Sequence, residues 1–312
     1  MISILDFAKL SLYVYKNQNL PHQLGNYIDK KVFSSETFNA THQANGMYEV
    51  IVNPATQSTA SIGNAFYASC FVKVKERKAT GVVIAIRGTV PTILEDDVVD
   101  IKTWWRSIFD DQARLTLPEN FFARALMFYR QVQRFAHEKL GLMNNKIYIT
   151  GHSLGGAIAA LIPTYALVQS RAVTFNAPGI LDMPDIKPLW HNVINFRSIF
   201  DFVSAIDRPI GPVWSTQVSE QYQQAAKAFG IAEEHKQNGW SRLDVINDIV
   251  ESVDFLESFA AQHSMANLLQ GLVTNSREIA ASPYGSLEST LAQFYDHPEK
   301  LGLQSPFITT IA

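Results

Sequence analysis

The sequence predicts an α/β fold in which a mostly parallel central sheet is flanked by helices. Two observations carry this prediction. Residues 81–86 form a continuous apolar run that suits a strand buried on both faces. A second apolar run, 147–149, leads through a glycine-rich turn into a helix, and strand and helix patterns alternate after it. The 312 residues are 47% hydrophobic, enough to bury a large core. We expect one domain over 1–312, with a helical insertion around 218–262.

Each remaining element is predicted from its hydrophobic spacing, which is near 3.6 residues for helices and 2 for half-buried strands. The expected elements are a covering helix at 3–15, a possible strand at 47–52 within the polar stretch 16–64, strands at 66–74 and 81–86, a helix of about five turns at 121–135, the strand at 147–149, a helix at 157–162, strands at 172–175 and 193–199, and a short helix after 264. The working groups of such a sheet gather at the carboxyl ends of its parallel strands.

Composition excludes several classes of function. The net charge is -3 and the pI is about 6.2, so no nucleic-acid partner is expected. The single cysteine, Cys70, lies in an alternating strand pattern and is expected to be a small buried residue. No cluster of metal ligands is visible. The N-terminus lacks a secretory signal, and the longest apolar stretch, 157–168, contains Pro163 and is too short to span a membrane. We expect a cytoplasmic chain, or one exported without a cleavable signal.

The most informative segment is 151–156, G-H-S-L-G-G, which joins the strand at 147–149 to the following helix. A strand that turns sharply into a helix through G-x-S-x-G is typical of a nucleophile elbow, where a strained backbone holds the serine hydroxyl outward. Glycines flank the serine because side chains there would collide with the adjoining strand and helix. The alternative is a simple turn that caps the helix. We interpret Ser153 as a candidate nucleophile.

A serine nucleophile needs a base and an acid that orients it. In the chain order Ser, Asp, His, the acid follows a strand and the base lies downstream of it. Asp201 stands just beyond the strand at 193–199 and is the preferred acid, whereas Asp207 is more simply a partner of Arg208 in a turn.

Three downstream histidines could be the base. His263 is preferred because it lies where an apolar helix meets a small polar segment that could carry it over the sheet. His297 lies in a turn and is the alternative, and His235 lies in a charged run that favours a solvated face.

Two groups are candidates for stabilising a tetrahedral oxyanion. One is the main-chain N–H of Leu154, the residue after the nucleophile, and the other is Thr89 at the end of R-G-T. Beyond Thr89, Trp104 and Trp105 follow an acidic stretch. They suggest either a lid-like flap that meets an apolar substrate or a surface loop anchored by two buried rings.

These motifs resemble the class 3, or fungal-type, triacylglycerol lipase family. The matching residues are I-A-I-R-G-T at 84–89, G-H-S-L-G-G-A at 151–157, N-A-P at 176–178, D-F-V at 201–203 and a late His263. The resemblance implies an α/β-hydrolase fold with a lid after the R-G-T strand, the triad Ser153, Asp201 and His263, an oxyanion hole at Thr89 and Leu154, and no cofactor. The chain departs from many members at Asn176, where they have Gly, and at Ser204, where they have Pro.

We therefore expect a serine ester hydrolase that cleaves carboxylic esters of lipids through an acyl-enzyme and touches a lipid or membrane surface transiently. A phospholipase A or lysophospholipase is the near alternative. An inactive α/β-hydrolase scaffold that binds lipid or protein through Trp104 and Trp105 is the alternative of another class.

Overall fold

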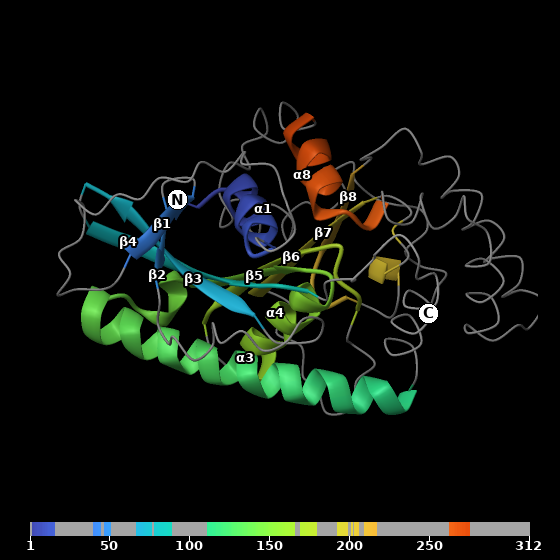
Figure 1. Ribbon diagram of the computed structural model, residues 1–312, viewed down its shortest axis with the longest axis horizontal. Coiled ribbons are helices and arrows are strands. Elements are labelled where there is room, and N and C mark those ends of the chain that lie inside the picture. The colour runs from blue at the N-terminus through green and yellow to red at the C-terminus, as the bar shows by residue number, and fades with distance from the viewer. Residues whose placement is uncertain are drawn as a thin grey trace, which may run out of the picture.

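The computed structural model describes twelve parts of the 312-residue chain: 2–15, 40–44, 47–50, 67–76, 78–88, 111–165, 169–179, 192–198, 201, 203–205, 209–216 and 262–274. These parts hold an eight-stranded sheet and four α-helices around it (Figure 1). The predicted helical insertion around 218–262, except its last residue, lies outside the described residues, as do Trp104 and Trp105.

The eight strands lie in the sheet in the order in which they occur along the chain. The strands are β1 (Ala40–Ala44), β2 (Met47–Val50), β3 (Ala68–Lys75), β4 (Lys78–Ile86), β5 (Ile147–His152), β6 (Arg171–Phe175), β7 (Val193–Ser198) and β8 (Val213–Thr216). Pairing is antiparallel from β1 to β4 and parallel from β4 to β8. The sheet is thus mixed, and its parallel part carries the segments that the sequence singled out.

Strand β4 shows why an unbroken apolar run predicted a central strand. Ile84 and Ile86 contribute to one hydrophobic core, with helices on that face, and Val83 and Ala85 contribute to another core on the opposite face. All four side chains are fully buried. Because successive side chains of a strand point to opposite faces, only a strand covered on both sides needs apolar residues at every position.

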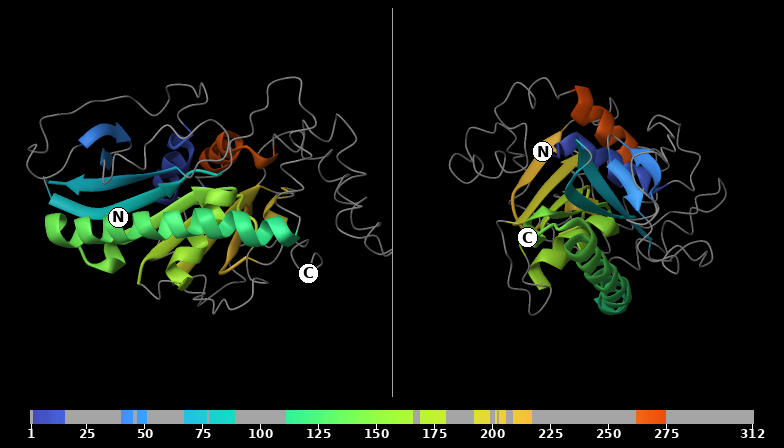
Figure 2. Two further views of the ribbon diagram at one scale, coloured as in Figure 1. Left: turned by 60° about the horizontal axis from the view of Figure 1, so that its bottom comes forward. Right: turned by 90° about the vertical axis from the view of Figure 1, so that its left-hand side faces the viewer.

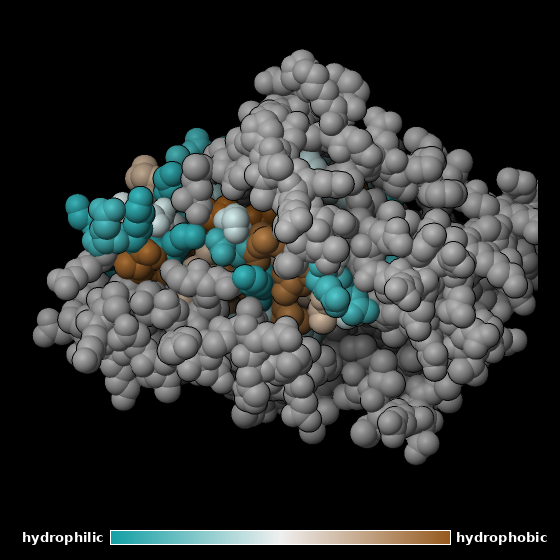
Figure 3. All heavy atoms as spheres, turned by 90° about the horizontal axis from the view of Figure 1, so that it is seen from above, coloured by the Kyte–Doolittle hydropathy of each residue, from teal (hydrophilic) through white to brown (hydrophobic). Residues whose placement is uncertain are grey.

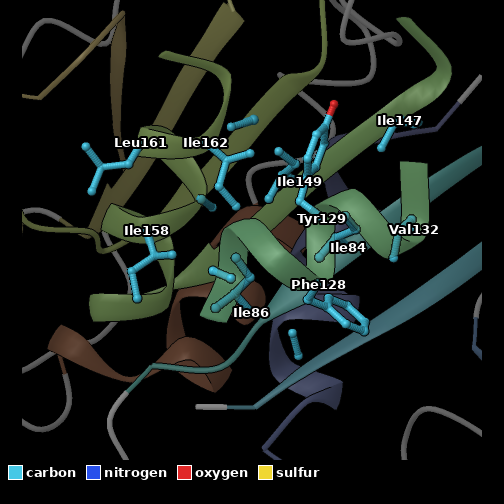
Figure 4. Packing of buried hydrophobic residues seen from close by; sticks show 14 of the residues in the cluster. Ile84, Ile86, Phe128, Tyr129, Val132, Ile147, Ile149, Ile158, Leu161 and Ile162 are labelled. Carbon is cyan, nitrogen blue, oxygen red and sulfur yellow. The ribbon is translucent and has the colours of Figure 1, made fainter. Parts of the chain in front are cut away.

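Helices cover both faces of the sheet, as two further views show (Figure 2). Helices α3 (Asp111–Leu140) and α4 (Leu154–Tyr165) pack on one face, where their apolar side chains meet those of β4 and β5 (Figure 4). Helices α1 (Ile4–Tyr13) and α8 (Met265–Thr274) pack on the other face. Seen from the side of α1 and α8, hydrophobic and hydrophilic residues lie side by side among the described residues (Figure 3).

Helix α1 is fastened to the sheet by specific polar contacts as well as by apolar packing. Ser3 caps the helix in a reciprocal capping box with Asp6, so the N–H groups of both residues have acceptors. On the buried face, the Ser11 hydroxyl lies 2.9 Å from the Thr150 hydroxyl of β5. These contacts fix the helix beside the strand that ends at the candidate nucleophile.

Several elements differ from the prediction in extent. Helix α3 begins at Asp111 and has 30 residues, so it starts ten residues before the apolar spacing that predicted it. Strands β1 and β8 were not predicted, since each is short and β1 lies in a polar stretch. Cys70 is buried, as expected. Among the described helices, none is long and apolar enough to cross a membrane.

Candidate active site

The candidate site lies at one edge of the sheet, where the parallel strands end. Ser153 follows the last residue of β5, and Asp201 lies three residues beyond the end of β7. His263 lies just before α8, on a segment that crosses the same edge. The parallel pairing of β5, β6 and β7 brings these carboxyl ends together even though the residues are far apart along the chain.

The backbone at Ser153 has the strained conformation of a nucleophile elbow. Its φ of 57° lies in the left-handed region, which non-glycine residues adopt rarely. The Ser153 N–H donates to the carbonyl oxygen of Phe175 at 3.0 Å, so the neighbouring strand β6 holds the turn. Gly151 and Gly155 face each other so closely that a side chain on Gly151 would collide with the main chain of Gly155. Glycine is therefore required at Gly151, because its Cα lies against the main chain of Gly155.

One imidazole ring lies between the candidate nucleophile and the candidate acid. Nε2 of His263 is 2.9 Å from Oγ of Ser153, and Nδ1 is 2.9 Å from Oδ1 of Asp201. The Asp201 side chain is fully buried, whereas 13% of the His263 side chain is exposed. A carboxylate only accepts hydrogen bonds, so Nδ1 carries the proton of the neutral ring and Nε2 is left to accept one from the serine. This is the tautomer that a general base requires.

The second carboxylate oxygen of Asp201 is held by the short helix that follows it. The Ser204 N–H donates to Oδ2 at 3.1 Å, and the Ser204 hydroxyl donates to the main-chain oxygen of Asp201. Arg197 lies in the same buried region and donates to the carbonyl oxygen of Ser204. Burial lowers the pKa of Arg197 to about 10, although the charge of Asp201 opposes that shift. Arg197 therefore stays charged at neutral pH.

The candidate oxyanion groups are described only in part. Leu154 is the first residue of α4, so its N–H is one of the four at a helix start that have no partner within the helix. Thr89 lies outside the described residues, but Gly88 before it is described and buried. The alternatives Asp207, His235 and His297 also lie outside the described residues. Among those described, no group of three or more His, Cys, Asp or Glu could hold a metal ion.

The N-terminal part of the chain, including the elbow, matches a known protein family. Residues 7–185 match the family described as "Phospholipase-like: Tle-like phospholipase domain". This range is more than half of the chain and contains most of α1, the elbow and Ser153, but it ends before Asp201 and His263. The chain belongs to the Tle-like phospholipase domain family. The resemblance to class 3 lipases remains a prediction.

Individual relatives of this Tle-like domain are remote. The candidate lipase ATG15 of Candida glabrata is 35% identical over 103 residues, which cover 28% of this chain and 19% of that protein. The chain thus spans less than a fifth of the length of that relative. The extracellular lipase LipA of Serratia marcescens has 16% identity and a TM-score of 0.47, over 87% of this chain and 50% of that one. M37 lipase has 20% identity and a TM-score of 0.36, over 71% of this chain and 81% of that one.

The sequence did not predict roles for three polar residues near the candidate triad. His152 precedes the nucleophile, and its Nε2 lies 2.7 Å from the carbonyl oxygen of His263. Tyr15 lies just beyond α1, with its hydroxyl 2.9 Å from Nδ1 of His152. Asn176 follows β6 and donates to the carbonyl oxygens of Gln262 and His263. Asn176 was noticed only as a departure from a motif, and nothing in the sequence around Tyr15 signals its contact.

Proposed function

We propose that this chain hydrolyses carboxylic ester bonds of lipids, with Ser153 as nucleophile, His263 as general base and Asp201 as the acid that orients it. The observation that carries the proposal is the position of the His263 ring, 2.9 Å from both Ser153 Oγ and Asp201 Oδ1. A serine hydroxyl is a weak nucleophile unless a base takes its proton as it attacks, and this arrangement supplies that base.

In the proposed first half-reaction, Ser153 Oγ attacks the carbonyl carbon of the ester while its proton passes to Nε2 of His263. The buried carboxylate of Asp201 stabilises the imidazolium that forms. The tetrahedral intermediate then collapses, and the ester oxygen leaves as an alcohol with the proton from Nε2. The acyl group stays on Ser153 until water, deprotonated by the same histidine, releases it as a fatty acid.

The negative charge of each intermediate needs fixed hydrogen-bond donors. We assign this role to the N–H of Leu154, at the start of α4, and to Thr89, which follows the buried Gly88 at the end of β4. Removing one such donor typically costs about 2.7 to 4 kcal/mol of transition-state stabilisation. The dipole of α4 adds to the effect, because the N-terminus of a helix favours negative charge.

Membership of the Tle-like phospholipase domain family supports a lipid ester as the substrate and favours a phospholipid over a neutral lipid. A class 3 triacylglycerol lipase is the second candidate, supported by the motifs around Thr89 and Ser153. In either case we propose that Trp104 and Trp105 belong to a flap that meets apolar substrate. No cofactor enters this mechanism.

The test is release of fatty acid from a small panel: a diacyl phospholipid, a lysophospholipid, a triacylglycerol and a short-chain soluble ester, each with wild-type protein and Ser153→Ala. We expect release from at least one acyl ester, with phospholipid preferred, and loss of release in the variant. Equal release by Ser153→Ala would remove the serine from the mechanism. A folded wild-type protein without activity on any ester would favour the inactive scaffold.

A further inference from the structure

A chain of hydrogen bonds joins Gly88, two residues after β4, to the main chain of the candidate base without passing through the side chains of the triad. The Gly88 N–H donates to the Tyr15 hydroxyl at 3.0 Å. That hydroxyl lies 2.9 Å from Nδ1 of His152, whose Nε2 lies 2.7 Å from the carbonyl oxygen of His263. All of these contacts are buried or nearly so.

The direction of each bond follows from the chemistry of its ends. The carbonyl oxygen of His263 only accepts, so Nε2 of His152 carries a proton. Burial, and after it the electrostatic effect of His263, lowers the pKa of His152 well below its usual range, so the His152 ring is neutral and its Nδ1 accepts. Burial also raises the pKa of the Tyr15 hydroxyl, which stays protonated and donates to Nδ1. Tyr15 thereby selects the tautomer that lets His152 donate to His263.

Asn176 also donates to the His263 carbonyl oxygen. Its Nδ2 donates to the carbonyl oxygens of Gln262 at 3.0 Å and His263 at 3.2 Å, and to the Ser198 hydroxyl at 3.2 Å. Its Oδ1 accepts the Ser198 N–H at 2.7 Å, which fixes the orientation of the amide. Asn176 is fully buried with a φ of 45°, a left-handed conformation that asparagine tolerates better than most residues.

We propose that Tyr15, His152 and Asn176 are positioning residues that clamp the main chain of His263, so that its ring stays between Ser153 and Asp201. The inference rests on the proposed function. His263 lies two residues before α8. The carbonyl oxygen of His263 accepts from His152, at the end of β5, and from Asn176, just after β6. Tyr15 links His152 to Gly88, which precedes the proposed oxyanion donor Thr89.

The first test compares two tyrosines that each lose only a hydroxyl. Tyr15→Phe breaks the chain of hydrogen bonds. Tyr129→Phe removes the hydroxyl of another buried tyrosine, on α3, which lies 2.7 Å from the Ser170 hydroxyl. Hydrolysis of a short soluble ester gives kcat and KM, and thermal unfolding gives Tm. We expect Tyr15→Phe to lower kcat by about 10- to 100-fold with KM within about twofold, because small misplacements of reacting groups cost rates of this order. Tyr129→Phe should lower Tm and leave kcat unchanged.

Variants of Asn176 and His152 test the same proposal if Tyr15→Phe does not fold. Asn176→Gly tolerates the left-handed backbone and deletes only the amide, and should also lower kcat. His152→Gln can still donate to the His263 carbonyl, whereas His152→Leu cannot, so the glutamine variant should recover at least about tenfold of the lost kcat.

The outcomes separate this inference from the proposed function. If the wild-type protein hydrolyses esters but Tyr15→Phe and Asn176→Gly keep kcat within twofold while losing Tm as Tyr129→Phe does, the three residues are structural only. Equal kcat for His152→Gln and His152→Leu would likewise overturn the clamp. A wild-type protein that hydrolyses no ester would overturn the proposed function, and the clamp with it.

Discussion

Gly155, two residues after the serine of the elbow, packs directly against the main chain at Arg87, the residue after β4. A methyl group at Gly155 would lie 2.7 Å from the carbonyl carbon of Arg87 and 2.8 Å from the N–H nitrogen of Gly88. Both neighbours are backbone atoms and cannot move aside cheaply. The elbow and the proposed oxyanion loop are therefore held at a separation that only glycine allows.

Gly155→Ala should cost about 1 to 3 kcal/mol of unfolding free energy, the usual range for forcing an extra carbon into a packed site. It should also lower kcat at least about tenfold, because it pushes Ser153 away from the end of β4. Denaturant unfolding and steady-state kinetics check the two effects.

Gly141→Ala is the matched control. It has a φ of 65° but no atom within 4 Å of the added methyl group, so it should cost about 1 kcal/mol through backbone strain alone and leave kcat unchanged. If Gly155→Ala behaved like this control, close contact at the elbow would not matter for activity.

Ser153 should show a conflict between stability and activity. With a φ of 57°, the backbone there favours glycine, so Ser153→Gly should be about 1 kcal/mol more stable than Ser153→Ala. Both variants should lose about 10⁵-fold or more in kcat, because the nucleophile is gone. Chemical denaturation of the two variants measures the difference. Equal stabilities would mean that the strain at this position is relieved elsewhere.

Asp201→Asn should lower kcat by about 10⁴-fold through the tautomer of His263. The Ser204 N–H needs an acceptor, so the asparagine oxygen should take the place of Oδ2. The amide NH₂ then faces Nδ1 of His263 and moves the ring proton to Nε2, where it blocks proton transfer from Ser153. Asp207→Asn, the alternative acid, should keep near wild-type kcat in the same assay. The reverse result would exchange the two assignments.

His152 should make stability depend on pH in the acid range. Its pKa is lowered in the folded state, so below about pH 6.5 the unfolded chain binds a proton that the folded chain does not. Above that pH, His152 does not lower the free energy of unfolding. At more acidic pH this residue lowers the free energy of unfolding by up to about 1.4 kcal/mol per pH unit. Glutamine does not titrate, so His152→Gln should show a shallower decline between pH 7 and 5. Parallel curves would contradict a neutral buried ring.

The parts of the fold that sequence could predict are those in which local pattern and tertiary burial agree. β4 is apolar over 81–86 and β5 over 147–149 because helices cover both faces of the sheet there. The glycines of the elbow are required because main chains meet closely at these positions. β8 has no such pattern. Its partner is β7, whose Asn195 side chain donates to the carbonyl oxygens of Ile210 and Pro212, just before β8. Such long-range pairing leaves little trace in a four-residue strand.

The candidate site divides in the same way. Ser153, Asp201 and His263 could be named because each has a chemical type and a place at a strand or helix end. Tyr15 and Asn176 could not, because their roles depend on distances between segments about 70 to 140 residues apart. A tyrosine at the end of an amphipathic helix is an ordinary core residue until the fold places its hydroxyl between Gly88 and His152.

The most direct measurement is labelling of the full chain by a fluorophosphonate, followed by mass spectrometry of the labelled peptide. Phosphonylation requires an activated serine, so we expect one adduct per chain, on Ser153, absent from Ser153→Ala and formed at least about 100-fold more slowly in His263→Ala. Folded protein that takes up no label, or carries it on another residue, would contradict the account.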